Sequence, residues 1–253
     1  MAKKLSVSDL CYSYHTEEGE TSALSRISFS LENGEFMAIV GPSGCGKSTL
    51  LSLLCGLLKP ESGEILLDGR PLSEGKANIG YMLQRDQLFQ WRTILSNVSL
   101  GLEIRKTADA EHLHRVQEML SLYGLADFAG ARPSELSGGM RQRAALVRTL
   151  ALDPDILMLD EPFSALDYQT RLEVCDDISS IIRRRKKTAI LVTHDLSEAI
   201  SAADRILVLS RRPGRVKAIF DTPFQDRQAS PLKRRRMPEF SACFDRLWAE
   251  LKD

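Results

Sequence analysis

The feature that most constrains this chain is the segment GPSGCGKST at residues 41–49. It fits the pattern G-x-x-x-x-G-K-[ST], and apolar runs flank it at residues 36–40 and 50–54. A strand, a glycine-rich turn and a helix in this order bring backbone N–H groups together at a helix N-terminus, where they bind anions. The segment therefore predicts a loop that holds the phosphates of a nucleoside triphosphate.

The residue types in this loop have separate predicted roles. The Lys47 ammonium reaches the β- and γ-phosphates, and the Ser48 hydroxyl is a ligand of Mg²⁺. We expect every residue of the loop to contribute to nucleotide binding: Gly41, Pro42, Ser43, Gly44, Cys45, Gly46, Lys47, Ser48 and Thr49. The helix-terminal amides could lower the pKa of the Cys45 thiol, although a small residue that simply fits the loop is the plainer interpretation. A connecting loop that binds nothing is the alternative, and the flanking elements argue against it.

Composition indicates a globular protein without a membrane-spanning segment. The chain has 253 residues, 43% of them hydrophobic and 27% charged, and its formal net charge of zero gives no indication of nucleic-acid binding. No apolar run approaches the roughly 20 residues that span a bilayer, and the N-terminus lacks the apolar centre of a signal peptide. The five cysteines form no C-x-x-C pair, so we expect reduced thiols, a cytosolic location and only a peripheral role at a membrane.

The order of apolar patterns indicates an α/β fold with a mostly parallel sheet. The predicted strands lie near residues 5–14, 23–31, 64–69, 79–83, 156–159, 189–192 and 206–209. Helical periodicity appears over residues 95–125 and again after residue 139, so a helical insertion interrupts the sheet.

These patterns predict a single domain, residues 1–253, with three parts. The core comprises residues 1–85 and 150–210, the helical subdomain residues 86–149, and the C-terminal extension residues 211–253. Residues 211–214 predict a turn in the extension, and residues 240–251 a short amphipathic helix.

Two acidic residues follow the apolar run at residues 156–159. A carboxylate at the end of a strand beside a phosphate loop is well placed to help bind Mg²⁺, and this is the role predicted for Asp160. The next residue, Glu161, is placed to accept a proton from an attacking water. Solvated acids at a strand end are the alternative, and the upstream phosphate loop favours the catalytic role.

A second glycine-containing segment, LSGGMRQR at residues 136–143, opens another predicted helix. Its amides and helix dipole would make a second anion site. Because one nucleotide needs only one phosphate-binding loop, we interpret this second anion site as one that closes on a nucleotide bound by another subunit. An ordinary N-capped helix with a glycine turn is the alternative.

With these motifs the chain resembles the nucleotide-binding subunit of an ABC transporter over residues 5–210. The resemblance implies a P-loop NTPase core of the ABC ATPase type, with an N-terminal antiparallel β part and a helical subdomain insertion. It implies that ATP and Mg²⁺ are the cofactors, that hydrolysis drives solute translocation, and that two copies dimerise head to tail. The implied partners are integral membrane permease subunits and, indirectly, a solute-binding protein, with no nucleic acid.

The resemblance also implies roles for matching residues. Tyr14 would stack on adenine, and Gln84 would contact Mg²⁺ and water, so that Ser48, Gln84 and Asp160 surround the metal. His194 would contact the γ-phosphate and join Glu161, Gln84 and Lys47 in catalysis.

Two further segments have implied roles at the dimer interface. Ser137, Gly138 and Gly139 would act on the partner's nucleotide. Asp167, in the segment SALD at residues 164–167, would lie across the interface.

The chain also resembles one importer branch of this family. Met140 departs from the commonest family pattern, which has glutamine there, and the segments at residues 84–91 and 210–214 resemble the branch that takes up nitrate, taurine and other sulfonates. This implies a bacterial protein at the cytoplasmic face of the inner membrane. The alternatives are a non-transport ABC-type ATPase acting on nucleic acid or ribosomes, and a nucleotide-sensing regulatory subunit with negligible turnover.

Two surface features leave alternatives open. Phe89 and Trp91 would either line a groove for a helix of a membrane subunit or pack inside the helical insertion. The basic runs at residues 183–187 and 233–236 would either form solvated faces, the simpler interpretation, or approach anionic headgroups.

Overall fold

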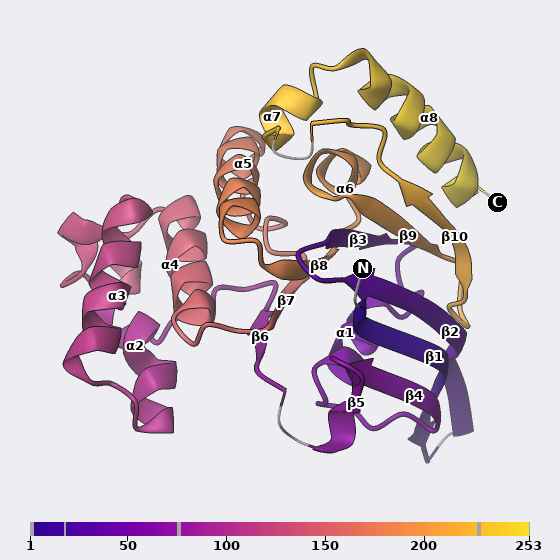
Figure 1. The fold of residues 1–253 in the computed structure, drawn as a ribbon, viewed down its shortest axis with the longest axis horizontal. Coiled ribbons are helices and arrows are strands. Elements are labelled where there is room, and N and C mark those ends of the chain that lie inside the picture. Colours follow the sequence, from indigo (N-terminus) through magenta and orange to yellow (C-terminus); the bar gives the residue numbers. More distant parts are fainter. Residues whose placement is uncertain (1–2, 18, 75–76, 227–228, 253) are drawn as a thin grey trace. The chain divides into compact units, whose positions relative to one another are not determined.

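The computed structural model describes residues 3–17, 19–74, 77–226 and 229–252. The chain forms two compact units (Figure 1). Unit 1 consists of Met1–Ala77 and Ser179–Asp253, and unit 2 of Asn78–Ile178.

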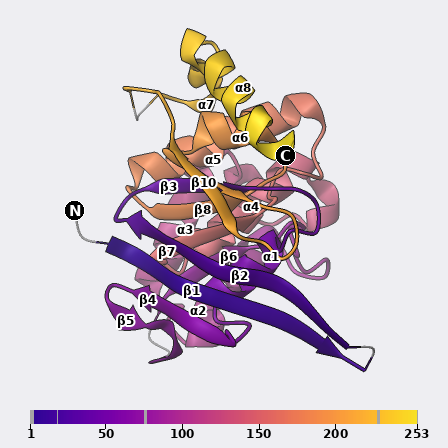
Figure 2. The same ribbon diagram turned by 90° about the vertical axis from the view of Figure 1, so that its right-hand side faces the viewer.

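An antiparallel sheet forms the N-terminal part of unit 1 (Figure 2). Its strands are β1 (Lys3–Thr16), β2 (Gly19–Glu32), β4 (Ser62–Leu67) and β5 (Arg70–Pro71), in the order β2-β1-β4-β5, and a 3₁₀ turn (Leu72–Glu74) follows. The predicted strands are confirmed, and β1 and β2 are longer than predicted, at 14 residues each. The outer ends of β1 and β2 pair with each other as far as Thr16 and Gly19. These ends are polar, so no apolar run in the sequence indicates that they are strands.

A second group of strands in unit 1 carries the residues that precede the phosphate loop. The strand β3 (Phe36–Val40) pairs in parallel with β8 (Thr188–Val192) and β9 (Arg205–Leu209), as predicted. All five residues of β3 are buried, as are all five of β8, which is why these strands read as unbroken apolar runs. The helix α1 (Lys47–Leu54) follows β3, and α6 (Leu196–Ala202) follows β8.

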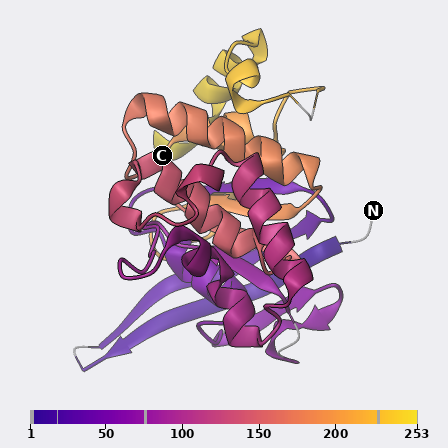
Figure 3. The ribbon, with the colours of Figure 1, turned by 90° about the vertical axis from the view of Figure 1, so that its left-hand side faces the viewer.

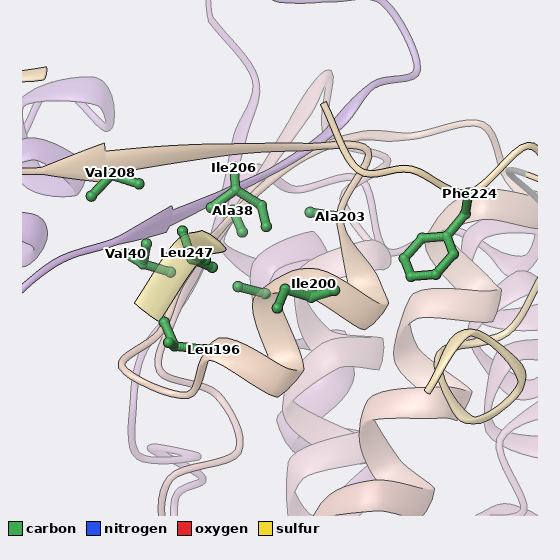
Figure 4. Close-up of a cluster of buried hydrophobic side chains, with 10 residues drawn as sticks. Ala38, Val40, Leu196, Ile200, Ala203, Ile206, Val208, Phe224 and Leu247 are labelled. Atoms are coloured by element: carbon green, nitrogen blue, oxygen red, sulfur yellow. The ribbon is translucent and has the colours of Figure 1, made fainter. Parts of the chain in front are cut away.

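The C-terminal extension completes the core of unit 1 (Figure 4). It contains β10 (Val216–Asp221), antiparallel to β9, and the helices α7 (Pro231–Arg234) and α8 (Pro238–Lys252), the second of which confirms the predicted helix. Leu247 and Phe224 are buried in one apolar cluster with Ile206 and Ile200. The strand β10 was not predicted, because none of its residues is fully buried and its pattern is short.

Unit 2 combines a parallel strand pair with helices, and Figure 3 shows these helices. The strand β6 (Ile79–Met82) pairs with β7 (Ile156–Asp160). The helices are α2 (Ile94–Arg105), α3 (Ala110–Leu122), α4 (Gly138–Leu150) and α5 (Tyr168–Arg184). The last residues of α5, from Ser179 on, belong to unit 1. Two 3₁₀ turns lie at Ala126–Phe128 and Pro133–Glu135. Among the described residues, no helix is long and apolar enough to cross a membrane.

The predicted helical stretch over residues 95–125 is divided into α2 and α3. Lys106 ends α2 in the left-handed conformation, with φ of 57°, and the Asp109 side chain caps α3 by accepting a bond from the His112 N–H. Periodicity continues across the break, so only the cap residues mark it.

A buried carboxylate connects distant segments of unit 1. Asp204 accepts hydrogen bonds from the Phe36 N–H (3.0 Å) and from Arg183 Nη1 (2.8 Å), and Arg234 Nη2 lies 3.7 Å from it. Arg234 is fully buried and donates hydrogen bonds to the carbonyls of Ser201 and Ala203. Its burial is the largest cause that lowers the pKa of its guanidinium group to about 10.

The solvated-face interpretation is therefore wrong for one member of each basic run. The side chains of Arg183 and Arg234 are only 7% and 0% exposed, and both lie near Asp204. Sequence charge alone does not distinguish them from their exposed neighbours.

We expect Arg234→Ala to lower the free energy of unfolding by about 3 kcal/mol, because it removes a partner from a buried ion pair. The matched control is Arg236→Ala in the same basic run, which should change stability by less than about 0.5 kcal/mol because Arg236 is exposed. Chemical denaturation measures both. Equal stabilities of the two variants would contradict the structural role of Arg234.

Candidate functional site

The predicted phosphate loop lies between β3 and α1 in unit 1. Gly44 and Gly46 have φ values of 75° and 102°, a region that residues with a Cβ rarely adopt. A Cβ on Gly46 would also lie 2.7 Å from Leu24 Cδ2. The glycines are therefore required by the loop's curvature and by its close approach to β2.

The side chains of Lys47, Ser48 and Thr49 lie where the loop passes into the first turn of α1. Lys47 Nζ donates hydrogen bonds to the carbonyls of Gly41 (2.8 Å) and Pro42 (3.0 Å), so the ammonium lies against the loop. Ser48 and Thr49 are in the first turn of α1. Burial raises the pKa of the Cys45 thiol and outweighs the lowering effect of Lys47, so a reactive thiolate is not what this loop provides.

Tyr14, the predicted adenine contact, lies beside the same helix. Its hydroxyl is 3.0 Å from Thr49 Oγ1, and its ring packs edge-on against Tyr12 with centroids 5.1 Å apart. Tyr14 as a whole remains 38% exposed, so the residue is not enclosed in the core.

His194 is exposed in the connection between β8 and α6, and its neighbours fix the backbone on both sides. The buried Thr193 donates its hydroxyl proton to Glu198 Oε2 (2.7 Å). Asp195 caps α6 by accepting bonds from the N–H groups of Ser197 and Glu198. The buried Glu198 therefore holds the backbone just before His194, and the sequence did not indicate this because an acid in a first helical turn is ordinarily solvated.

In unit 2, Asp160 and Glu161 are at the carboxyl end of β7. Asp160 Oδ2 accepts a hydrogen bond from the Tyr81 hydroxyl on β6 (3.2 Å). Glu161 has φ of 44°, an unusual conformation for a residue with a side chain and one that is frequent at functional sites. Tyr81 was not predicted, and its only signal is its place on the strand beside β7.

Gln84 lies in the same part of unit 2 as the acids. Its Nε2 is 3.1 Å from Ser164 Oγ and 3.5 Å from Glu161 Oε2. The Ser164 hydroxyl in turn donates to the Glu161 carbonyl (3.0 Å). The structure therefore brings the predicted base, the predicted glutamine and an intervening serine into one hydrogen-bonded group.

The glycine segment at residues 137–139 begins α4. Ser137 caps the helix by accepting a bond from the Met140 N–H (3.3 Å). A Cβ on Gly139 would lie 2.8 Å from Thr170 Cγ2 on α5, so close helix packing also requires this glycine. Asp167 caps α5 through Thr170, and these hydrogen bonds lower the pKa of its carboxyl group.

Two arginines of α4 hold the segment that follows Gln84. Arg141 Nε is 3.1 Å from Asp86 Oδ2, and Arg148 donates to the carbonyls of Asp86 (2.6 Å) and Gln87 (2.7 Å). A pocket of about 400 Å³ lies between this segment and the start of α4. Hydrogen bonds therefore connect α4, the helix that begins with the glycine segment, directly to the residues that follow Gln84.

Comparison with known proteins shows which family the chain resembles in sequence. The sequence profile described as "ABC transporter" matches residues 24–164. The chain is 44% identical over 247 residues to the uncharacterized ABC transporter ATP-binding protein YtlC of Bacillus subtilis, covering 98% of this chain and 95% of that protein. It is 45% identical over 207 residues to the taurine import ATP-binding protein TauB of Rhizobium johnstonii, covering 82% of this chain and 79% of TauB.

Solved structures show the same fold. The dimeric post-hydrolysis state of the ATP-binding cassette MJ0796, bound to ADP and Pi, has a TM-score of 0.74 and 30% identity over 87% of this chain and 99% of that chain. The cbiO1 protein of Clostridium perfringens, part of the ABC transporter complex cbiONQ, has a TM-score of 0.77 and 30% identity over 88% of this chain and 90% of its own.

The chain belongs to the ABC transporter family. It is an ATP-binding subunit that hydrolyses ATP in coupling to transport, and the predicted fold class is confirmed. The roles of individual residues remain predictions.

We expect Glu161→Gln to leave ATP binding intact and to lower the steady-state ATPase rate by about 10²–10⁴-fold, because the amide cannot accept a proton from water. The matched control is Glu173→Gln, an exposed residue of α5, which should leave the rate unchanged. Phosphate release and nucleotide binding are measured on the same preparations. Hydrolysis by Glu161→Gln at the parent rate would remove Glu161 from the base role.

Proposed function

We propose that this chain drives the import of a small solute, of the nitrate, taurine or sulfonate class, through membrane permease subunits. The similarity to TauB supports this class of solute and favours transport over a non-transport or purely regulatory role. A peripheral position at the cytoplasmic face of the membrane follows from this proposal.

Two copies of the chain would bind ATP head to tail, and the dimeric structure of the MJ0796 cassette supports the formation of a dimer. The loop at residues 41–49 holds the phosphates from one copy, and Ser137, Gly138 and Gly139 approach from the other. Closure excludes water from the site and completes it, and hydrolysis reopens the dimer.

The residues proposed to surround Mg²⁺ offer the hard oxygen donors that this ion prefers. Ser48 presents a hydroxyl in the first turn of α1, and Asp160 a carboxylate held by Tyr81. Gln84 donates through Nε2 to Ser164, which leaves its amide oxygen as the acceptor. When bound, Mg²⁺ would supply charge neutralisation at the phosphates, while Glu161 accepts the proton from water and His194 contacts the γ-phosphate.

The observation that carries the coupling proposal is an exposed aromatic pair beyond Gln84. Trp91 is 72% exposed and Phe89 37%, with ring centroids 4.8 Å apart, which is against the alternative that both pack inside the helical insertion. The buried Asn97 fixes this segment by accepting from the Phe89 N–H (2.7 Å) and donating to three backbone carbonyls. A rigid apolar pair of this kind suits the binding of a short helix from a permease.

Transport itself tests the proposal. The chain, its permease and the solute-binding protein are reconstituted in vesicles, and ATP-dependent uptake of labelled nitrate, taurine and alkanesulfonates is measured. We expect one solute class to accumulate and to stimulate ATP hydrolysis. ATP hydrolysis without accumulation of any of these solutes would contradict the proposed substrate class.

We expect Trp91→Ala to leave the basal ATPase rate within about twofold and to reduce permease-stimulated hydrolysis by more than tenfold, since truncating an interfacial anchor weakens docking by about 2 kcal/mol or more. Trp248→Ala on α8 is the matched control, because Trp248 is also exposed, at 49%, and lies in the C-terminal extension. A pull-down with the permease gives the binding defect directly. Unchanged stimulation in Trp91→Ala would contradict the docking role.

A further inference from the structure

One cluster of three potential metal-ligating side chains occurs in the part of the chain that the structure describes. It consists of His15 on β1, Glu20 on β2 and Glu61 just before β4, all in unit 1. The candidate ligand atoms all lie within 4.8 Å of one another. The nucleotide site described above uses none of these side chains.

Two residues of the cluster lie on the β1–β2 hairpin (Figure 2), His15 near the end of β1 and Glu20 near the start of β2. They are directly paired in the antiparallel register, which puts their side chains next to each other. The Glu61 N–H donates to the Cys11 carbonyl (3.1 Å), and Glu61 Oε1 accepts from the Ser13 N–H (3.0 Å). His15 Nε2 lies 2.9 Å from the same Oε1.

The charge of the cluster favours a cation. Within the described ranges, no lysine or arginine forms an ion pair with Glu20 or Glu61. Two carboxylates therefore lie beside one imidazole without a compensating lysine or arginine among the described residues.

We propose that His15, Glu20 and Glu61 bind a divalent transition-metal cation such as Zn²⁺. One imidazole nitrogen and two carboxylate oxygens form a donor set typical of Zn²⁺ and its neighbours, whereas Mg²⁺ and Ca²⁺ prefer oxygen donors alone. With metal–ligand bonds of about 2.1 Å, tetrahedral ligand atoms are about 3.4 Å apart. The ligand atoms now lie within 4.8 Å of one another, so the proposal requires these exposed side chains to rotate closer together, with water completing the coordination.

A cation at this site ties together three segments of unit 1: the end of β1, the start of β2 and the residues before β4. Tyr14, the proposed adenine contact, immediately precedes His15 on β1 and reaches Thr49 through its hydroxyl. The metal therefore stabilises the strand that carries this contact, and binding to the native state raises the thermal unfolding midpoint.

Calorimetry with the full-length chain tests the proposal. The reduced, nucleotide-free protein is titrated with Zn²⁺ alone, and Mg²⁺ serves as the comparison ion. We expect one equivalent of Zn²⁺ to bind with a micromolar dissociation constant and to raise the thermal unfolding midpoint, with no Mg²⁺ binding at this site. His15→Ala should weaken Zn²⁺ binding at least tenfold and abolish the rise.

The matched control is His114→Ala. His114 also pairs with one glutamate, Glu118, at 3.4 Å, but it belongs to no three-ligand cluster among the described residues. This variant should bind Zn²⁺ like the parent, and circular dichroism verifies that both variants are folded.

Cobalt distinguishes this site from the cysteines. Co²⁺ at the proposed site should give d–d absorption without the thiolate charge-transfer band, since none of the ligands is sulfur. Parent-like Zn²⁺ affinity in His15→Ala, a thiolate band with Co²⁺, or no saturable binding would each overturn the proposal.

Discussion

The burial of the Asp204 carboxylate is the constraint on which unit 1 depends. An ionised group in a core must be paired, and Asp204 is paired with Arg183 and the Phe36 N–H, with Arg234 close by. These contacts connect the start of β3, the end of α5 and the helix α7 of the C-terminal extension. Because β3 leads directly into the phosphate loop, the extension belongs to the same packed core that positions that loop.

In both units the predicted functional residues, or the backbone next to them, form hydrogen bonds with residues that were not predicted to be functional. Tyr81 holds Asp160, and Ser164 joins Gln84 to Glu161. Glu198 similarly fixes the backbone before His194 through Thr193. Such partners limit how far a catalytic side chain can move, which is the geometric precision that catalysis needs.

Much of the fold was predictable because its signals are local. The buried strands β3, β7 and β8 are unbroken apolar runs, and both glycine segments begin helices. The strand β10 and the break between α2 and α3 were not predictable from periodicity, since short amphipathic segments give weak patterns. The burial of Arg183 and Arg234 was missed because a charge run gives no sign of which member lies near a distant carboxylate.

The sequence by itself determined the phosphate loop, the two acids after β7 and the family to which they point, because these motifs are fixed by spacing along the chain. Only the tertiary structure decided the rest. It exposed Trp91, buried Arg234 and brought His15, Glu20 and Glu61 together from separate segments. The physical reason is that pairing and burial depend on which surfaces meet when strands and helices pack, and that information is not contained in any local pattern.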